Sequence, residues 1–129
     1  MAYDAYDARI ETLVMETLTH WDPALAKLAQ ANLSRTAGKA IVVAGPLVQG
    51  WPEQAPYDVI FLNGASEIVP RALFGQLAER GRLVAVIGRA PAARAMLYRR
   101  VGDDVSGWPV FDAAAKVLPG FAAPPEFVF

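Results

Sequence analysis

The chain has 129 residues, of which 54% are hydrophobic and 19% charged, and its formal net charge at pH 7 is −1. This composition predicts one folded domain, and the near-balanced charge gives no electrostatic basis for binding nucleic acid or an anionic membrane. Without cysteine, disulfides and thiolate nucleophiles are excluded, and the single histidine, His20, leaves no histidine-rich metal site. No apolar run reaches the roughly 20 residues of a membrane span, and no signal-peptide pattern opens the chain, so we expect a cytoplasmic protein.

Apolar residues near the N-terminus recur at helical spacing, at Ile10, Leu13, Val14, Leu18 and Trp21. With Asp7 as N-cap they predict a first helix, although residues 17–20 also fit a strand. Asp22-Pro23 predicts the start of a second helix, because proline is tolerated at a first helical position. We expect this helix to fade by residues 34–38, so that residues 1–37 form a helical segment of the single domain.

The centre of the chain predicts a strand-helix-strand unit. Residues 59–62 and 83–87 are short continuous apolar runs, which is typical of strands buried on both faces. Between them, Pro70 is placed to open a helix and Gly81 to end it. The apolar stripe of this helix is Leu73, Phe74, Leu77 and Ala78. Two buried strands joined by one helix are expected to be parallel, with a right-handed crossover.

Further strands are predicted on both sides of this unit. Residues 40–44 form another buried apolar run, and residues 47–56 a loop that precedes the central unit. Residues 95–101 and 105–111 are expected to pair as a hairpin about Gly102-Asp103-Asp104. A short helical or irregular segment should follow, and residues 127–129 end the chain as a last strand. Residues 38–129 would thus hold the core and the hairpin.

From Asp22 to Phe129 the sequence resembles the C-terminal half of the protein-L-isoaspartate O-methyltransferase family. The matching pieces, in order, are residues 51–58, Gly64-Ala65, residues 68–70, residues 73–77, residues 81–84, Gly88-Arg89, residues 118–121 and residues 127–129. The resemblance implies an α/β fold: a partial, doubly wound, Rossmann-like methyltransferase sheet. We expect this sheet to be mostly parallel, with an antiparallel C-terminal hairpin and helices packed on its faces. It also implies S-adenosylmethionine at the carboxyl ends of the strands.

The departures from the family pattern concern the groups that would hold the cofactor. Such enzymes carry a glycine-rich turn after their first strand, whereas the first glycine here is Gly38. The position of the acidic residue that would accept the ribose hydroxyls falls on His20 or Trp21, and an imidazole cannot clamp two hydroxyls as a carboxylate does. In place of the family's Gly-Asp-Gly stands Ala44-Gly45-Pro46, and the substrate-holding N-terminal part has no counterpart. We therefore predict a truncated domain with no catalytic residues and no cofactor.

Without its central strand the sheet would contain unpaired backbone groups. Direct closure, with the strand at Ile41 beside the strand at Val59 and the two N-terminal helices covering the faces, is the favoured solution. A strand borrowed from a second copy, or an edge that dimerises, is the alternative. A homo-oligomer or a protein partner is therefore expected, and neither nucleic acid nor membrane.

Candidate ligand-binding residues follow the carboxyl end of the strand at 59–62, where open parallel sheets bind ligands. Asn63, Gly64, Ser66 and Glu67 lie there, and Asp58 opens the same strand. An ordinary strand-to-helix turn and a strand-start pairing would explain the same residues. Three functions stay open: a degenerate, non-catalytic interaction or regulatory module, an S-adenosylmethionine-dependent methyltransferase fragment completed by another chain, and a small-molecule binder at Asn63–Glu67.

Overall fold

The computed structural model describes residues 12–15, 23–36, 43 and 45–125, and the account below concerns these residues. The elements are, in chain order, β1 (Thr12–Met15), α2 (Pro23–Thr36), the 3-10 helices η1 (Leu47–Gln49) and η2 (Pro52–Gln54), β2 (Tyr57–Ser66), α3 (Arg71–Phe74), β3 (Leu77–Ile87), β4 (Arg94–Val101) and β5 (Asp104–Asp112).

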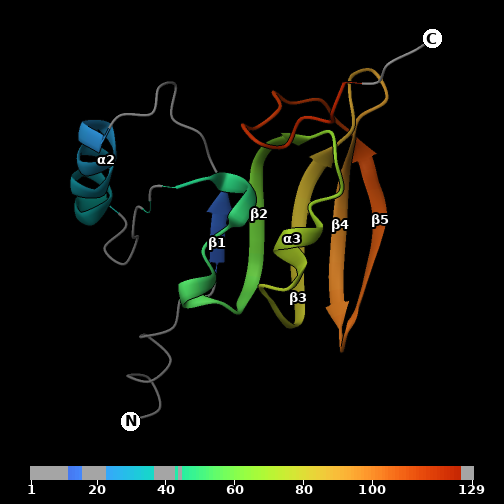
Figure 1. The fold of residues 1–129 in the computed structure, drawn as a ribbon, viewed down its shortest axis with the longest axis horizontal. Coiled ribbons are helices and arrows are strands. Elements are labelled where there is room, and N and C mark those ends of the chain that lie inside the picture. The colour runs from blue at the N-terminus through green and yellow to red at the C-terminus, as the bar shows by residue number, and fades with distance from the viewer. Residues whose placement is uncertain (1–11, 16–22, 37–42, 44, 126–129) are drawn as a thin grey trace.

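The five strands form one sheet in the order β1-β2-β3-β4-β5 (Figure 1). β2 is parallel to both β1 and β3, whereas β4 is antiparallel to both β3 and β5. The antiparallel pairings register more residues than the parallel ones, so the prediction of a mostly parallel sheet is wrong. β4 and β5 are joined by a tight turn that reverses the chain, and this hairpin supplies two of the five strands.

The N-terminal predictions are partly corrected. Residues 12–15 form a strand and not a helix, because Leu13 pairs with Ile60 of β2 and its side chain packs against the core. The expected helix start at Pro23 is confirmed by α2. Most of the run at 40–44 and the alternative strand at 17–20 lie outside the described residues. The favoured closure is wrong, because β1 and not the Ile41 segment is the neighbour of β2.

The central unit is confirmed in its strands and in the start of its helix, but the helix is shorter than predicted. β2 and β3 are parallel, as expected, and Figure 1 shows α3 in front of them in a right-handed crossover. However, α3 has only four residues, because Leu77 already pairs with Tyr57 at the start of β3. Gly81 therefore ends no helix. It is buried in β3, where a Cβ atom would lie 2.8 Å from the Ala78 carbonyl oxygen and 2.9 Å from that of Tyr57.

The C-terminal hairpin is confirmed. Gly102 takes a φ of 62° in the turn between β4 and β5, a conformation that glycine adopts without strain. Gly107 of β5 lies opposite Tyr98, and a Cβ atom there would come within van der Waals overlap of the Tyr98 ring. Residues 113–121 are irregular, with one bridge between Ala65 and Val117. The last strand predicted at 127–129 lies outside the described residues.

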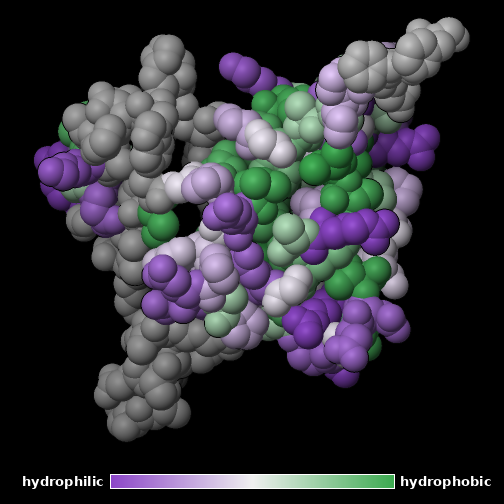
Figure 2. Space-filling view, in the orientation of Figure 1, coloured by the Kyte–Doolittle hydropathy of each residue, from purple (hydrophilic) through white to green (hydrophobic). Residues whose placement is uncertain are grey.

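The hydrophobic core lies on one face of the sheet, beneath α3 and the two 3-10 helices. Its buried members are Tyr57, Ile60, Leu62, Leu73, Leu77, Leu83, Ala85, Tyr98, Leu118 and Phe121. Figure 2 views this face, with apolar residues gathered over β2 to β4. Figure 1 shows α2 standing beyond β1 and away from the sheet, so the predicted pair of N-terminal helices covering both faces is wrong for the described residues.

A buried amide joins the loop before β2 to the segment after α3. The Gln76 side chain accepts a hydrogen bond from the Trp51 N–H at 3.0 Å and donates one to the Gln49 carbonyl at 2.7 Å. The Tyr57 hydroxyl donates to the Trp51 carbonyl at 2.5 Å, and the Tyr57 N–H donates to the Gln76 carbonyl at 2.8 Å. Because these bonds satisfy backbone groups of an irregular loop, they hold it against the core.

Because of the Tyr57 hydroxyl, we expect the folded chain to lose stability at alkaline pH. Burial raises the pKa of Tyr57, and the nearby Glu53 carboxylate raises it further. A tyrosine of the unfolded chain ionises near pH 10, so the stabilisation is fully present below about pH 10 and is lost as the pH rises through the folded pKa. We expect the urea midpoint to fall as the pH rises above about pH 10, and to fall less for Tyr57→Phe.

Some alkaline loss should remain in the Tyr57→Phe variant, because burial also raises the pKa of Tyr98. At pH 8, below the alkaline transition, the variant should still be less stable than the wild type, since it lacks the hydrogen bond that the Tyr57 hydroxyl donates to the Trp51 carbonyl. If the urea midpoints of the wild type and Tyr57→Phe fell equally steeply with rising pH, the alkaline loss could not be assigned to Tyr57.

Candidate functional site

The expected site lies at the upper end of the sheet in Figure 1, where β2 and β3 end side by side. β2 ends at Ser66 and β3 at Ile87, and these two residues are register partners. The Gly88 N–H donates a hydrogen bond to the Ser66 carbonyl at 2.8 Å, which fixes the two chain reversals against each other. Any ligand at this edge would have to meet the residues that follow β2.

Ser66 is fully buried and its hydroxyl is used within its own turn. Its Oγ atom donates to the Ile68 carbonyl at 2.5 Å and accepts from the Ile68 N–H at 3.2 Å. This is a local side-chain-to-backbone turn of the kind that serine forms readily. The hydroxyl therefore shapes the chain reversal after β2.

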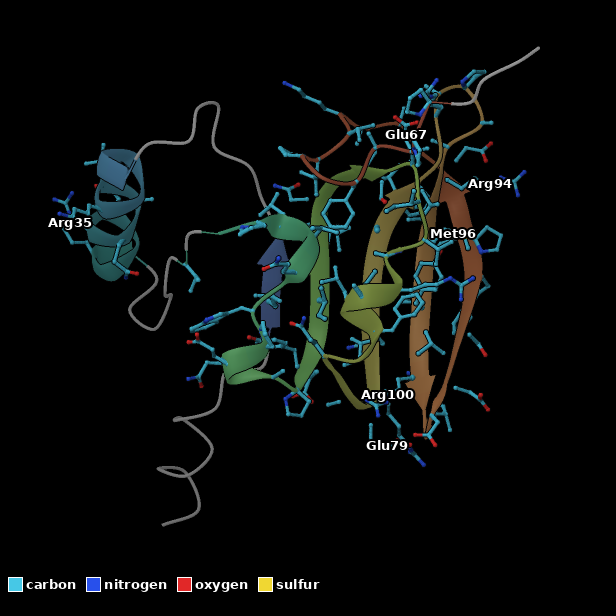
Figure 3. The ribbon with its side chains drawn as sticks, viewed as in Figure 1. Arg35, Glu67, Glu79, Arg94, Met96 and Arg100 are labelled. Carbon is cyan, nitrogen blue, oxygen red and sulfur yellow. The ribbon has the colours of Figure 1, made fainter. Side chains whose placement is uncertain are left out.

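Glu67 follows at the same edge and holds an arginine (Figure 3). The Arg89 Nε–H donates to a Glu67 carboxylate oxygen at 2.6 Å, while the Glu67 side chain is only 13% exposed and that of Arg89 is 76% exposed. A charge-assisted hydrogen bond of this length links the residue after β2 to the segment after β3. The carboxylate best placed to accept ligand hydroxyls is thus engaged with a guanidinium group.

Residues 116–121, which we name the strap, cross the carboxyl end of β2. The Ala65 N–H donates to the Lys116 carbonyl at 2.8 Å, and the Leu118 N–H donates to the Ala65 carbonyl at 2.9 Å. The Glu67 N–H donates to the Phe121 carbonyl at 2.9 Å. Leu118 and Phe121 are buried, and a Cβ atom at Gly64 would lie 2.6 Å from the Leu118 side chain. The strap therefore packs directly against the carboxyl end of β2.

The five candidate residues do not form one cluster. Ser66 and Glu67 lie together beneath the strap. Asn63 and Gly64 come just before them and line a shallow hollow of about 180 Å³. Asp58 lies near the opposite end of β2, about eight residues from Ser66 along the strand, which at roughly 3.3 Å per residue is more than 20 Å. Asp58 therefore cannot share a small-molecule site with Ser66 and Glu67.

The important residues that the candidate set lacks are Arg89, Leu118 and Phe121. Arg89, Arg94 and Arg100 lie close together in the sequence, but these arginines have different partners in the structure. Arg94 lies 3.5 Å from the Asp112 carboxylate, and Arg100 donates to the Leu77 and Gly102 carbonyls. Figure 3 shows Arg100 at the end of the sheet opposite Glu67. The sequence does not indicate where Leu118 and Phe121 pack, because residues 113–125 contain no regular element.

The described ranges contain neither a metal-binding cluster nor a membrane-spanning helix. No group of three or more histidine, cysteine, aspartate or glutamate side chains there is arranged to hold a metal ion. No helix in these ranges is both long and apolar enough to cross a membrane.

The sheet, its right-handed crossover and its C-terminal hairpin define an α/β fold of the methyltransferase type. A solved protein-L-isoaspartate O-methyltransferase superposes with a TM-score of 0.67 and 26% identity, covering 84% of this chain and 34% of that one. A Plasmodium falciparum protein described as a beta-aspartate methyltransferase, solved with S-adenosyl-L-homocysteine, superposes with a TM-score of 0.56 and 18% identity over 75% of this chain and 49% of that one.

The sequence comparisons identify the family. The family model for protein-L-isoaspartate(D-aspartate) O-methyltransferase matches residues 13–113, and the chain belongs to this family. The Staphylothermus marinus enzyme is 39% identical over 83 residues, or 63% of this chain and 37% of that protein. The Halorhodospira halophila enzyme is 49% identical over 55 residues, or 43% of this chain and 25% of that protein. The chain thus spans about a third of the length of these relatives.

Proposed function

We propose that this chain is a degenerate domain of the protein-L-isoaspartate O-methyltransferase family that binds no S-adenosylmethionine and acts as a non-catalytic interaction or regulatory module. The observation that supports this most directly is the strap. It packs directly against the carboxyl end of β2 with Leu118 and Phe121 and uses the backbone groups of Ala65 and Glu67. In open α/β sheets this is the region where ligands bind.

Two other features of the same edge support the proposal. The Ser66 hydroxyl and the Glu67 carboxylate, which could have bound ligand hydroxyls, have partners within the chain. The sequence, in addition, has no glycine before Gly38, so it has no glycine-rich turn with which a backbone could approach a cofactor closely. These features also weigh against a small-molecule site at Asn63–Glu67.

Isothermal titration of the chain with S-adenosyl-L-homocysteine and S-adenosylmethionine tests the proposal. We expect no saturable heat at ligand concentrations up to about 1 mM, which is a binding free energy weaker than about −4 kcal/mol. The Staphylothermus marinus relative, titrated in the same buffer, is the positive control. Saturable binding with one site per chain and a micromolar Kd would overturn the proposal.

A second candidate is favoured by a different observation. Because the chain spans only 25–37% of these two relatives and β1 lies at the edge of the sheet, another polypeptide could supply the remaining part of a methyltransferase. In that case methyl transfer from S-adenosylmethionine to an isoaspartyl peptide would appear only when the chain is mixed with the N-terminal part of a relative. The non-catalytic proposal predicts no methyl transfer attributable to this chain, either alone or in the mixture.

A further inference from the structure

The face of the sheet opposite the core carries an exposed apolar row. Phe61 pairs with Val84, Val84 with Leu97, and Leu97 with Trp108, so the row crosses β2 to β5. Phe111 lies three residues further along β5, opposite Ala95, and lines the hollow together with Phe61, Val84 and Val86. Phe61, Trp108 and Phe111 are 39%, 42% and 63% exposed. We name this surface the bare face.

The position of the described elements explains why they leave the bare face uncovered. The right-handed crossover between β2 and β3 places their connection on one face of the sheet. That face is the one with α3, η1 and η2 on it. In the described residues no element packs over the bare face, and its aromatic rings remain exposed. Its occupant must therefore come from outside these elements.

The charges on the bare face are confined to one end. Arg82 and Arg99 are direct cross-strand partners in the row next to Val84 and Leu97. Both are exposed, and neither forms an ion pair or side-chain hydrogen bond within the described part of the chain. Like charges placed directly opposite each other are destabilising, so this pair gains from any group that stabilises cations. The other end of the face offers the exposed ring of Phe111.

These two ends complement each other, and we propose that the bare face binds the bare face of a second copy of this chain. A twofold axis running across the strands places the two apolar rows against each other. It also brings the Arg82–Arg99 pair of each copy over the Phe111 end of its partner, where guanidinium groups can stack on aromatic rings. An axis along the strands would instead bring the four arginines together. The interface is therefore isologous, with the strands of the two copies antiparallel.

The exposed area is sufficient for a weak dimer. With roughly 200 Å² per aromatic side chain, the three exposed rings present on the order of 300 Å² per copy. This is the size of surface patches that mark interaction sites, and the half-buried Val84, Val86 and Leu97 and the arginine stems add to it. A standard interface needs about 800 Å² per partner, so we expect a Kd in the micromolar range.

Sedimentation velocity over about 1–300 μM tests the dimer. The wild type should shift from monomer to dimer, and Trp108→Glu should weaken association at least about 10-fold, because it places a carboxylate at the β5 end of the apolar row. Leu28→Glu is the matched control, since Leu28 of α2 is 57% exposed and lies outside the bare face. A wild type that remains monomeric throughout, or a Leu28→Glu variant that alone loses the dimer, would overturn the proposal.

A mixture of Arg82→Glu with the wild type tests the direction of the axis. In the proposed arrangement each arginine pair faces aromatic rings, so the mixed dimer should be intermediate between the two parent dimers. With the axis along the strands, the introduced carboxylate would face the partner's Arg82, and the mixed dimer would be tighter than either parent. The dimer rests on the proposed function, because it supplies the partner of the proposed interaction module. Calorimetry tests cofactor binding and sedimentation tests the dimer, so either of these two proposals can fail without the other.

Discussion

Replacing Phe121 with alanine is expected to lower the free energy of unfolding by about 3–5 kcal/mol. The side chain is completely buried, and it anchors the strap against the core on the side of β2. Its removal leaves a cavity and also weakens the hydrogen bond that the Glu67 N–H donates to the Phe121 carbonyl. Because a domain of this size is stable by roughly 5–15 kcal/mol, the loss is a large fraction of the total. Urea denaturation followed by circular dichroism measures it.

Phe111→Ala is the matched control. The same side chain is removed from a position that is 63% exposed, so we expect a change within about 0.5 kcal/mol when the chain is studied at a concentration that keeps it monomeric. Equal losses for the two variants would show that the strap does not anchor the end of β2. In that case the main support for the proposed function would disappear.

The sequence predicted the elements whose signals are local. Proline at the first position located α2, and the continuous apolar runs located the centres of β2 and β3. The hairpin of β4 and β5 followed from alternation around Gly102. Each of these signals depends on a few neighbouring residues, and tertiary packing supports the same choice.

The helix predicted after Pro70 begins there but is much shorter than expected, because two patterns coincide. Leu73, Phe74 and Leu77 fit a helical stripe, but Leu77 and Leu83 also serve as buried positions of a strand. Leu77 pairs with Tyr57, and the Gln76 side chain is hydrogen-bonded to the loop before β2, so the chain enters β3 at Leu77 and does not continue as a helix. These contacts are long-range, and local sequence patterns cannot predict them. Likewise, Gly81 is required by the close approach of the Tyr57 carbonyl and not by a helix end.

The position of the candidate residues at the end of a strand could be predicted from the sequence, but the packing around them could not. The rule for open parallel sheets led to Asn63–Glu67, at the strand end where Ser66 and Glu67 lie. That the strap would cover this end depends on where an irregular segment packs, and residues 113–121 carry no periodic pattern. The resemblance to the family included residues 118–121, but sequence order alone could not connect Phe121 with Glu67.

Replacing Gln76 with alanine is expected to destabilise the chain by about 2–4 kcal/mol. The variant leaves the Trp51 N–H and the Gln49 carbonyl without the partners that they have at 3.0 and 2.7 Å, and an unpaired group at a buried site costs about 1–3 kcal/mol. Gly50 lies against this amide, since a Cβ atom there would be 2.6 Å from the Gln76 Oε1 atom. The loop from η1 to η2 should therefore loosen before the sheet unfolds.

Gln54→Ala is the control, because Gln54 is exposed at the end of η2 in the same loop. Hydrogen exchange distinguishes the two variants from a general loss of stability. In Gln76→Ala the amide of Trp51 should exchange much faster under conditions where the amides of β3 remain protected, and in Gln54→Ala both should keep their wild-type rates. A uniform acceleration across β3 and the loop would show that Gln76 supports the sheet as a whole and does not act as a local tie.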